Sequence, residues 1–66
     1  MMTIKLSDRW INRMRSLPES GMGYHRVKIM LNNGAVLGGV VWNSDILRMS
    51  GDTLFGVDDI AWIDLL

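Results

Sequence analysis

The sequence has no cysteine, a single proline and no long uninterrupted apolar run. Without cysteine there can be no disulfide, and the paired Cys/His spacing of a structural zinc site is missing as well. The uncharged run 29–44 is too short, and too rich in glycine and asparagine, for a membrane helix of about 20 apolar residues. Lys5, Asp8 and Arg9 stand where a signal peptide would have its apolar segment. We therefore expect a cytoplasmic protein that does not use a membrane.

The length of 66 residues predicts one domain that spans 1–66. A chain of this size buries only about 60% of the surface that its unfolded form exposes, so its isolated fold is marginal. Because no disulfide contributes, dense packing and self-association must supply the stability. The composition suits association, since 48% of the residues are hydrophobic and seven Lys/Arg balance seven Asp/Glu. We expect a homo-oligomer.

The balanced net charge hides an uneven distribution along the chain. Residues 1–30 carry six Lys/Arg and two Asp/Glu, a balance of +4, whereas residues 31–66 carry one and five, a balance of −4. Two interpretations stay open. The charges are solvated faces, or they form a basic surface for an anionic partner and complementary faces that join protomers.

Residues 7–17 have the spacing of a short amphipathic helix. Ser7 is a good capping residue, and the helix is expected to stop before Pro18, since the residue that precedes a proline avoids the helical region. Its apolar side chains recur three and four residues apart: Trp10, Ile11, Met14 and Leu17. So short a helix needs a surface to lie on, because it would not hold in water alone.

From Tyr24 onward the hydrophobic period changes to two, which predicts strands. In the first strand Val27, Ile29 and Leu31 should face the core, with the basic side chains on the opposite side. The Asn33-Gly34 turn needs positive φ, and Gly39 predicts a bend where strands approach closely. The expected strands are 24–31, 35–42, 46–50, 53–57 and 61–66, and a short helical turn capped by Asp58 covers 57–60.

These elements predict a mainly β fold, a five-stranded small barrel with one N-terminal helix over an open end. The expected helix is followed by five strands, Gly34, Gly39 and Asp45 are spaced five and six residues apart, and Leu54-Phe55-Gly56 comes later. This arrangement resembles that of the Sm-like (LSm-type) small β-barrel proteins. That resemblance covers roughly 7–66 and implies RNA binding by an oligomeric ring. The SH3-like barrels share such glycines and stay open as the alternative.

Two departures from the Sm-like pattern fall on its nucleotide-binding positions. Arg48-Met49 stands where that family has Met-Asn, and Phe55 stands where it has Arg. Methionine lacks the paired donor and acceptor of an amide, and phenylalanine brings no charge. The nucleotide pocket of the family is therefore not visible in this sequence. Residues 17–24 are also similar to short uncharacterised bacterial proteins, a likeness that implies no function.

No set of residues in the sequence indicates a particular enzymatic reaction. His25 shares the phase of the core residues and has no serine in a nucleophile-elbow context to work with. Two interpretations of His25 stay open: it is a hydrogen-bonded residue at the barrel mouth, or it makes a pH-sensitive contact. Asp58 and Asp59 would face opposite ways in an extended segment, and no loop gathers further oxygen ligands. We expect no catalytic residue, no metal, no cofactor and no enzymatic activity.

The sequence therefore predicts a non-enzymatic, self-associating interaction module that binds a protein partner, and the alternative is an Sm-like RNA-binding oligomer. RNA binding would be weak and electrostatic. Trp10 fits the core, and Trp62 fits burial in the closing strand, whose apolar edge is expected to join protomers. Candidate contacts with a partner or nucleic acid are Arg9, Arg13, Arg26, Lys28 and Trp42; candidate oligomer-edge residues are Trp62, Ile63 and Leu65; structural glycines are Gly34 and Gly39.

Overall fold

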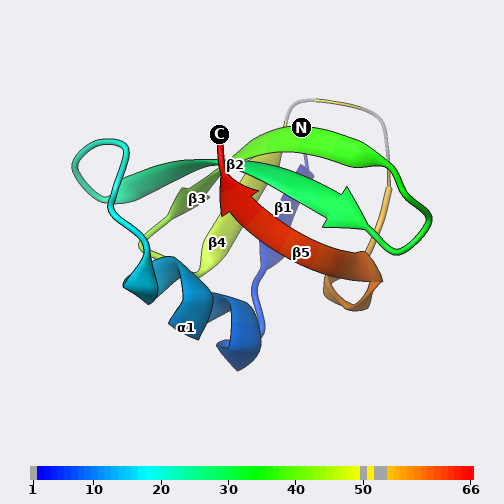
Figure 1. The fold of residues 1–66 in the computed structure, drawn as a ribbon, viewed down its shortest axis with the longest axis horizontal. Helices are drawn as coiled ribbons and strands as arrows, with labels where there is room; N and C mark the ends of the chain where they lie inside the picture. The colour runs from blue at the N-terminus through cyan, green and yellow to red at the C-terminus, as the bar shows by residue number, and fades with distance from the viewer. Residues whose placement is uncertain (1, 50, 52–53) are drawn as a thin grey trace.

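The computed structural model describes residues 2–49, 51 and 54–66, which form one five-stranded sheet and one α-helix (Figure 1). The elements run in the order β1 (Met2–Lys5), α1 (Asp8–Ser16), β2 (Tyr24–Leu31), β3 (Val36–Trp42), β4 (Ile46–Met49), the 3-10 turn η1 (Val57–Asp59) and β5 (Ile60–Leu65). The prediction of a mainly β chain with five strands and an N-terminal helix is confirmed.

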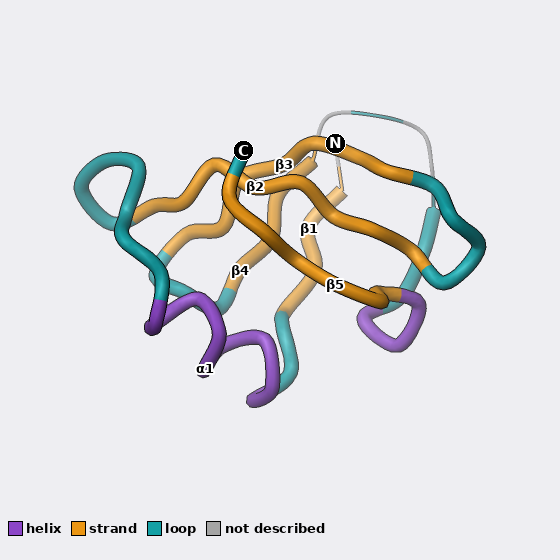
Figure 2. The backbone as a smooth tube through the Cα atoms, in the orientation of Figure 1, coloured by secondary structure: helices purple, strands orange, loops and turns teal. Residues whose placement is uncertain are grey.

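The strands lie side by side in the order β1-β4-β3-β2-β5, and every neighbouring pair is antiparallel. The prediction of a barrel is wrong, because β1 and β5 stay apart as the two edges of an open sheet (Figure 2). A barrel would close through pairing of these two strands. Instead α1 packs against the concave side of the sheet, and its Trp10 and Met14 fill the core there.

The observed strands differ from the predicted ones in two places. β1 was not expected, because four residues give too short an alternation and its partner β4 lies more than 40 residues away in sequence. The predicted strand 53–57 is also wrong: Thr53 lies outside the described residues, 54–56 have no regular structure, and η1 begins at Val57. Ser50, the predicted end of another strand, lies outside the described residues.

The helical turn at 57–60 was predicted, but its capping residue is different. Asp59, rather than Asp58, accepts a hydrogen bond through its Oδ2 from the backbone N–H of Gly56, at 2.8 Å. The Asp59 N–H donates to the carbonyl of Gly56 at 3.0 Å, so the two residues satisfy each other. Asp58 instead offers its backbone carbonyl to the Asn32 side chain at 3.1 Å.

The predicted helix is confirmed with slightly narrower bounds. Ser7 occupies the N-cap position, where its carbonyl accepts the N–H groups of Trp10 and Ile11, although its side chain makes no capping bond. The apolar face is buried through Trp10 and Met14, and Asp8 and Arg15 lie at the ends of the helix where their charges favour its dipole. α1 is therefore held mainly by its packing on the sheet.

The alternation predicted for β2 is confirmed. Val27, Ile29 and Leu31 are buried, whereas Arg26 and Lys28 are exposed on the other face. The core then combines side chains from all five strands and from the helix: Leu6, Trp10, Met14, Val27, Ile29, Leu31, Val41, Leu47, Met49, Ile60 and Ile63 are buried, with Met2 and Ile4 packed against them.

His25 is a buried residue of β2 that links the sheet to the end of the helix. It is only 1% exposed, and its Nε2 lies 3.0 Å from the carbonyl oxygen of Leu17, the residue that ends α1. Because a carbonyl only accepts, Nε2 must carry the hydrogen. The other ring nitrogen, Nδ1, is buried with no hydrogen-bond partner among the described residues. His25 therefore fixes where the chain leaves the helix.

Two substitutions of His25 separate this hydrogen bond from the packing of the ring. An Asn amide nitrogen occupies the place of Nδ1 and cannot reach Leu17, whereas a Gln amide nitrogen extends to the place of Nε2. We expect His25→Asn to lose about 1–3 kcal/mol of unfolding free energy, because the Leu17 carbonyl is left without its donor, and His25→Gln to lose clearly less. Urea denaturation measures both variants, and equal losses would contradict the role given to this bond.

Candidate interaction surfaces

The convex face of the sheet, which points away from α1, carries a row of residues in direct register. Arg26 on β2 lies opposite Val40 on β3, and Val40 lies opposite Arg48 on β4. Leu66 donates its N–H to the Arg26 carbonyl at 3.0 Å and so extends the row beyond β2. Neighbouring strands are about 4.8 Å apart, so the two arginines flank the valine at backbone distances of about 10 Å from each other.

This row lines a shallow hollow of about 440 Å³, which we call the outer groove. Gly38, which lies opposite the exposed Lys28, gives it depth because it places no side chain on this face. Most of the lining is apolar, and the two guanidinium groups are its charged members. The lining residues are Arg26, Gly38, Gly39, Val40, Trp42, Arg48, Met49 and Leu66.

An aromatic pair adjoins one end of the outer groove. Tyr24 and Trp42 are register partners, and their ring centroids are 5.1 Å apart at a tilt of 46°. Trp42 remains 40% exposed, so part of its ring is available to a ligand. Lys28 lies on the same face as Arg26, opposite Gly38. The convex face therefore combines cations, an exposed ring and an apolar floor.

The five residues predicted to contact a partner do not form one surface. Arg26, Lys28 and Trp42 share the convex face, but Arg9 and Arg13 belong to α1 on the other side of the sheet. The Arg9 guanidinium lies 4.4 Å from the centroid of the Trp10 ring, and Arg13 contacts β5. A helix residue cannot be placed relative to a sheet face from spacing alone, which is why the sequence did not separate the two groups.

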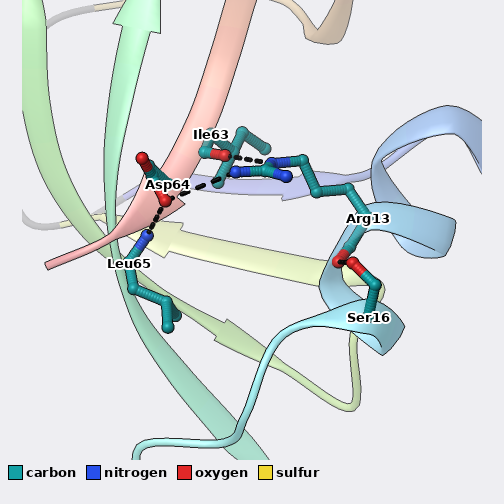
Figure 3. Close-up of polar contacts among 5 residues, drawn as sticks. All are labelled: Arg13, Ser16, Ile63, Asp64 and Leu65. Atoms are coloured by element: carbon teal, nitrogen blue, oxygen red, sulfur yellow. Dashed lines mark hydrogen bonds and ion pairs between the residues drawn. The ribbon is translucent and has the colours of Figure 1, made fainter.

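Arg13 covers the free edge of β5 (Figure 3). Because the Leu66 N–H points toward β2, alternation along an antiparallel strand turns the backbone groups of Ile63 and Leu65 outward. The Arg13 Nε donates to the carbonyl of Ile63 at 2.6 Å, and the Asp64 Oδ1 accepts the Leu65 N–H at 2.9 Å. An ion pair of 3.3 Å joins Arg13 to Asp64. We call this arrangement the edge clamp.

The residues predicted to form an oligomer edge instead belong to the edge clamp or pack beside it. Ile63 is fully buried, Leu65 is half-buried, and Trp62 packs edge-on against Trp10 at 6.0 Å between ring centroids. The Arg13 guanidinium lies over the Trp62 ring, 3.9 Å from its centroid. Self-association through these residues stays a prediction, and the edge clamp disfavours it.

Sequence reasoning missed the contributions of Arg48, Leu66 and Asp64 to these surfaces. Arg48 departs from the Sm-like pattern, and its place between the apolar Leu47 and Met49, both buried, indicates that it faces outward. No pattern in the sequence indicated that Asp64 meets Arg13, because these residues are 51 positions apart.

The glycines predicted to be structural serve different purposes. Gly34 has φ +92°, the left-handed region that the turn after β2 needs, and its N–H donates to the Leu31 carbonyl at 2.9 Å. At Gly39 a Cβ would lie 3.0 Å from side-chain atoms of Leu47 and Met49. The pairing of β2 with β3 runs through Gly39 without a register shift, and its close approach is to side chains and backbone of β4.

Among residues 2–49, 51 and 54–66, no three His, Asp or Glu side chains gather as a metal site would need. Within the same described part of the chain, no helix has the length and hydrophobicity that a membrane crossing requires. Comparison with models of protein families, with curated proteins and with solved structures finds no match to this chain. The resemblance to Sm-like proteins therefore stays a prediction.

Proposed function

We propose that this chain is a non-enzymatic interaction module that self-associates and binds a partner protein through the outer groove. The observation that carries the proposal is the row Arg26-Val40-Arg48, which places an apolar side chain between two guanidinium groups on an otherwise apolar floor. Guanidinium groups bind carboxylates through paired hydrogen bonds. The surface therefore suits a segment that carries acidic side chains on either side of an apolar one.

The spacing of the row further restricts which peptide sequences fit the outer groove. In an extended peptide every second side chain points to the same side, at about 6.8 Å intervals. An apolar residue placed over Val40 thus has acidic neighbours two positions away on each side, about 14 Å apart. The long arginine side chains can span the difference from the 10 Å or so between their backbones. We therefore expect the bound segment to have five residues, of which the first and the fifth are acidic and the third is apolar.

RNA is the second candidate, and one observation favours it. Arg26, Lys28 and the exposed part of the Trp42 ring share the convex face, which is the combination that single-stranded nucleic acid uses for phosphate contacts and base stacking. The apolar floor of the outer groove supports the protein partner instead, because phosphates gain nothing from Val40 and Leu66. Arg9 and Arg13 lie elsewhere, so only part of the basic half could act together.

An NMR titration of isotope-labelled protein tests both candidates. The probes are the blocked peptide Glu-Ser-Leu-Ser-Glu, its counterpart Lys-Ser-Leu-Ser-Lys, and oligouridine RNA. We expect the acidic peptide to shift the amide signals of Gly38, Gly39 and Val40, and the basic peptide to leave them unchanged. Arg26→Glu should abolish these shifts, whereas Arg15→Glu, the same charge change on the exposed side of α1, should retain them.

Other outcomes decide against the protein partner. Shifts caused by RNA alone, together with a raised 260/280 nm absorbance ratio of protein purified at low salt, would favour the second candidate. Weak RNA binding through phosphate contacts should fade with salt, at a log slope of about 0.7 per contact. An outer groove that responds to none of the probes would contradict the proposed recognition of an acidic segment.

A further inference from the structure

The two edges of the sheet differ in their free backbone groups. At β1, the Leu6 N–H donates to the Asp45 carbonyl at 2.7 Å, one step beyond the last register pair of β1 with β4. Bonded and non-bonded pairs alternate along an antiparallel ladder, so Ile4 also points its backbone groups toward β4. The N–H and C=O groups of Thr3 and Lys5 therefore point away from the sheet, along its free edge.

At the opposite edge two of the outward backbone groups already have partners. On β5 the outward carbonyl of Ile63 and the outward N–H of Leu65 are both engaged by the edge clamp of Arg13 and Asp64. A strand added there would have to displace a hydrogen bond, an ion pair and the stacking of Arg13 on Trp62. Of the two edge strands, β1 is thus the one prepared to accept a further strand.

We infer that a second copy of this chain pairs with β1 through its own β1, antiparallel about a two-fold axis, so that the two sheets become one continuous sheet. This inference rests on the self-association proposed above and assigns it to one edge. A β1 edge that pairs only with β1 gives a closed dimer, since the same surface is used twice. A ring or filament would need β1 to meet β5, which the edge clamp covers.

The register of this dimer follows from the faces of β1. Met2 and Ile4 pack toward the core, whereas Thr3 and Lys5 are exposed on the convex side. Opposed residues must share a face, and the outward groups of both Thr3 and Lys5 are used when Ile4 lies opposite Ile4 of the second copy and Thr3 lies opposite its Lys5. The outward backbone groups of Thr3 and Lys5 then form bonded pairs at both ends of the interface.

Charge and packing agree with this register. The two Lys5 side chains are not opposite each other, and each is paired with Asp45 of its own chain at 3.5 Å. Directly opposed like charges would oppose the pairing, and this register avoids them. The two Ile4 side chains meet at a non-bonded position, where opposed backbones are about 4.5 Å apart, and so extend the core across the interface.

Light scattering of the untagged protein at micromolar concentrations tests the inference. We expect twice the 7.5 kDa chain mass for the natural sequence and a single chain mass for Thr3→Pro. Proline removes the N–H of Thr3, which points away from β4, so the pairing within one chain is kept. Leu65→Pro removes an outward N–H of the other edge together with its bond to Asp64, and should leave the dimer intact because the dimer does not use β5.

Amide hydrogen exchange provides a second measurement that needs no variant. In the dimer the amides of Thr3 and Lys5 should exchange slowly, and their protection should fall on dilution, whereas the Ile4 amide should stay protected at every dilution. A dimeric Thr3→Pro, or fast exchange at Thr3 and Lys5 in a dimer, would overturn the assignment to β1 alone. A monomeric natural sequence would overturn the self-association as well.

Discussion

Trp10→Ala is expected to lose about 3–5 kcal/mol of unfolding free energy, as truncation of a buried tryptophan does. Trp10 is 3% exposed, and its ring packs edge-on against Trp62 of β5 while it fills the core beneath the sheet. A domain of 66 residues has a total stability of about 3–10 kcal/mol. The variant should therefore unfold at a clearly lower urea concentration than the natural sequence. Far-UV circular dichroism during a urea titration measures the loss.

Trp42→Ala is the matched control for this substitution. The residue type and the truncation are the same, but Trp42 is 40% exposed and its main partner is the Tyr24 ring. We expect a loss of about 1 kcal/mol, the scale of one aromatic pair. Equal losses for the two variants would show that burial under the helix does not account for the stability of this fold.

Gly39→Val is expected to lose about 1–3 kcal/mol, because overfilling a packed core forces side chains and backbone to move. A Cβ at this position would lie 3.0 Å from Leu47 Cδ1 and from Met49 Cγ, and 3.2 Å from the backbone oxygen of Arg48. The backbone oxygen cannot step aside as a flexible side chain can. The midpoint of thermal unfolding should fall accordingly.

The neighbouring glycine supplies a control on the same strand. Among the described residues, a Cβ at Gly38 would have only the Leu66 side chain within 4 Å, at 3.8 Å, which is an ordinary contact. Valine also suits a strand better than glycine does. We expect Gly38→Val to leave the melting midpoint unchanged or to raise it slightly. An unchanged midpoint for Gly39→Val would remove the role given to the close approach of β4.

The sequence predicted those parts of the fold that depend on local periodicity. The period of three and four around Trp10 and Met14 defined the helix, and the period of two from Tyr24 to Leu31 defined both faces of β2. Closure of the sheet depends instead on which strands meet, and β1 is too short to be recognised before its partner β4 is known. The predicted barrel followed from the bend expected at Gly39, yet the pairing of β2 with β3 runs through that residue without a register shift.

The candidate surfaces were predicted only where one strand supplied them. The outward phase of Arg26 and Lys28 follows from β2 alone, but the outer groove needs the register of β2, β3 and β4 to bring Arg26 and Arg48 to either side of Val40. The edge clamp joins residues about 50 positions apart, and only the packing of α1 beside β5 brings them together.

The edge clamp also makes the size of any assembly depend on the helix. Arg13 reaches β5 only while α1 is docked, so a molecule whose helix has come away presents two open sheet edges instead of one. Copies with two open edges can add to one another without a closing contact, which is the geometry of fibres and aggregates. We therefore expect the tendency of this chain to aggregate to depend on whether its helix of nine residues stays docked on the sheet.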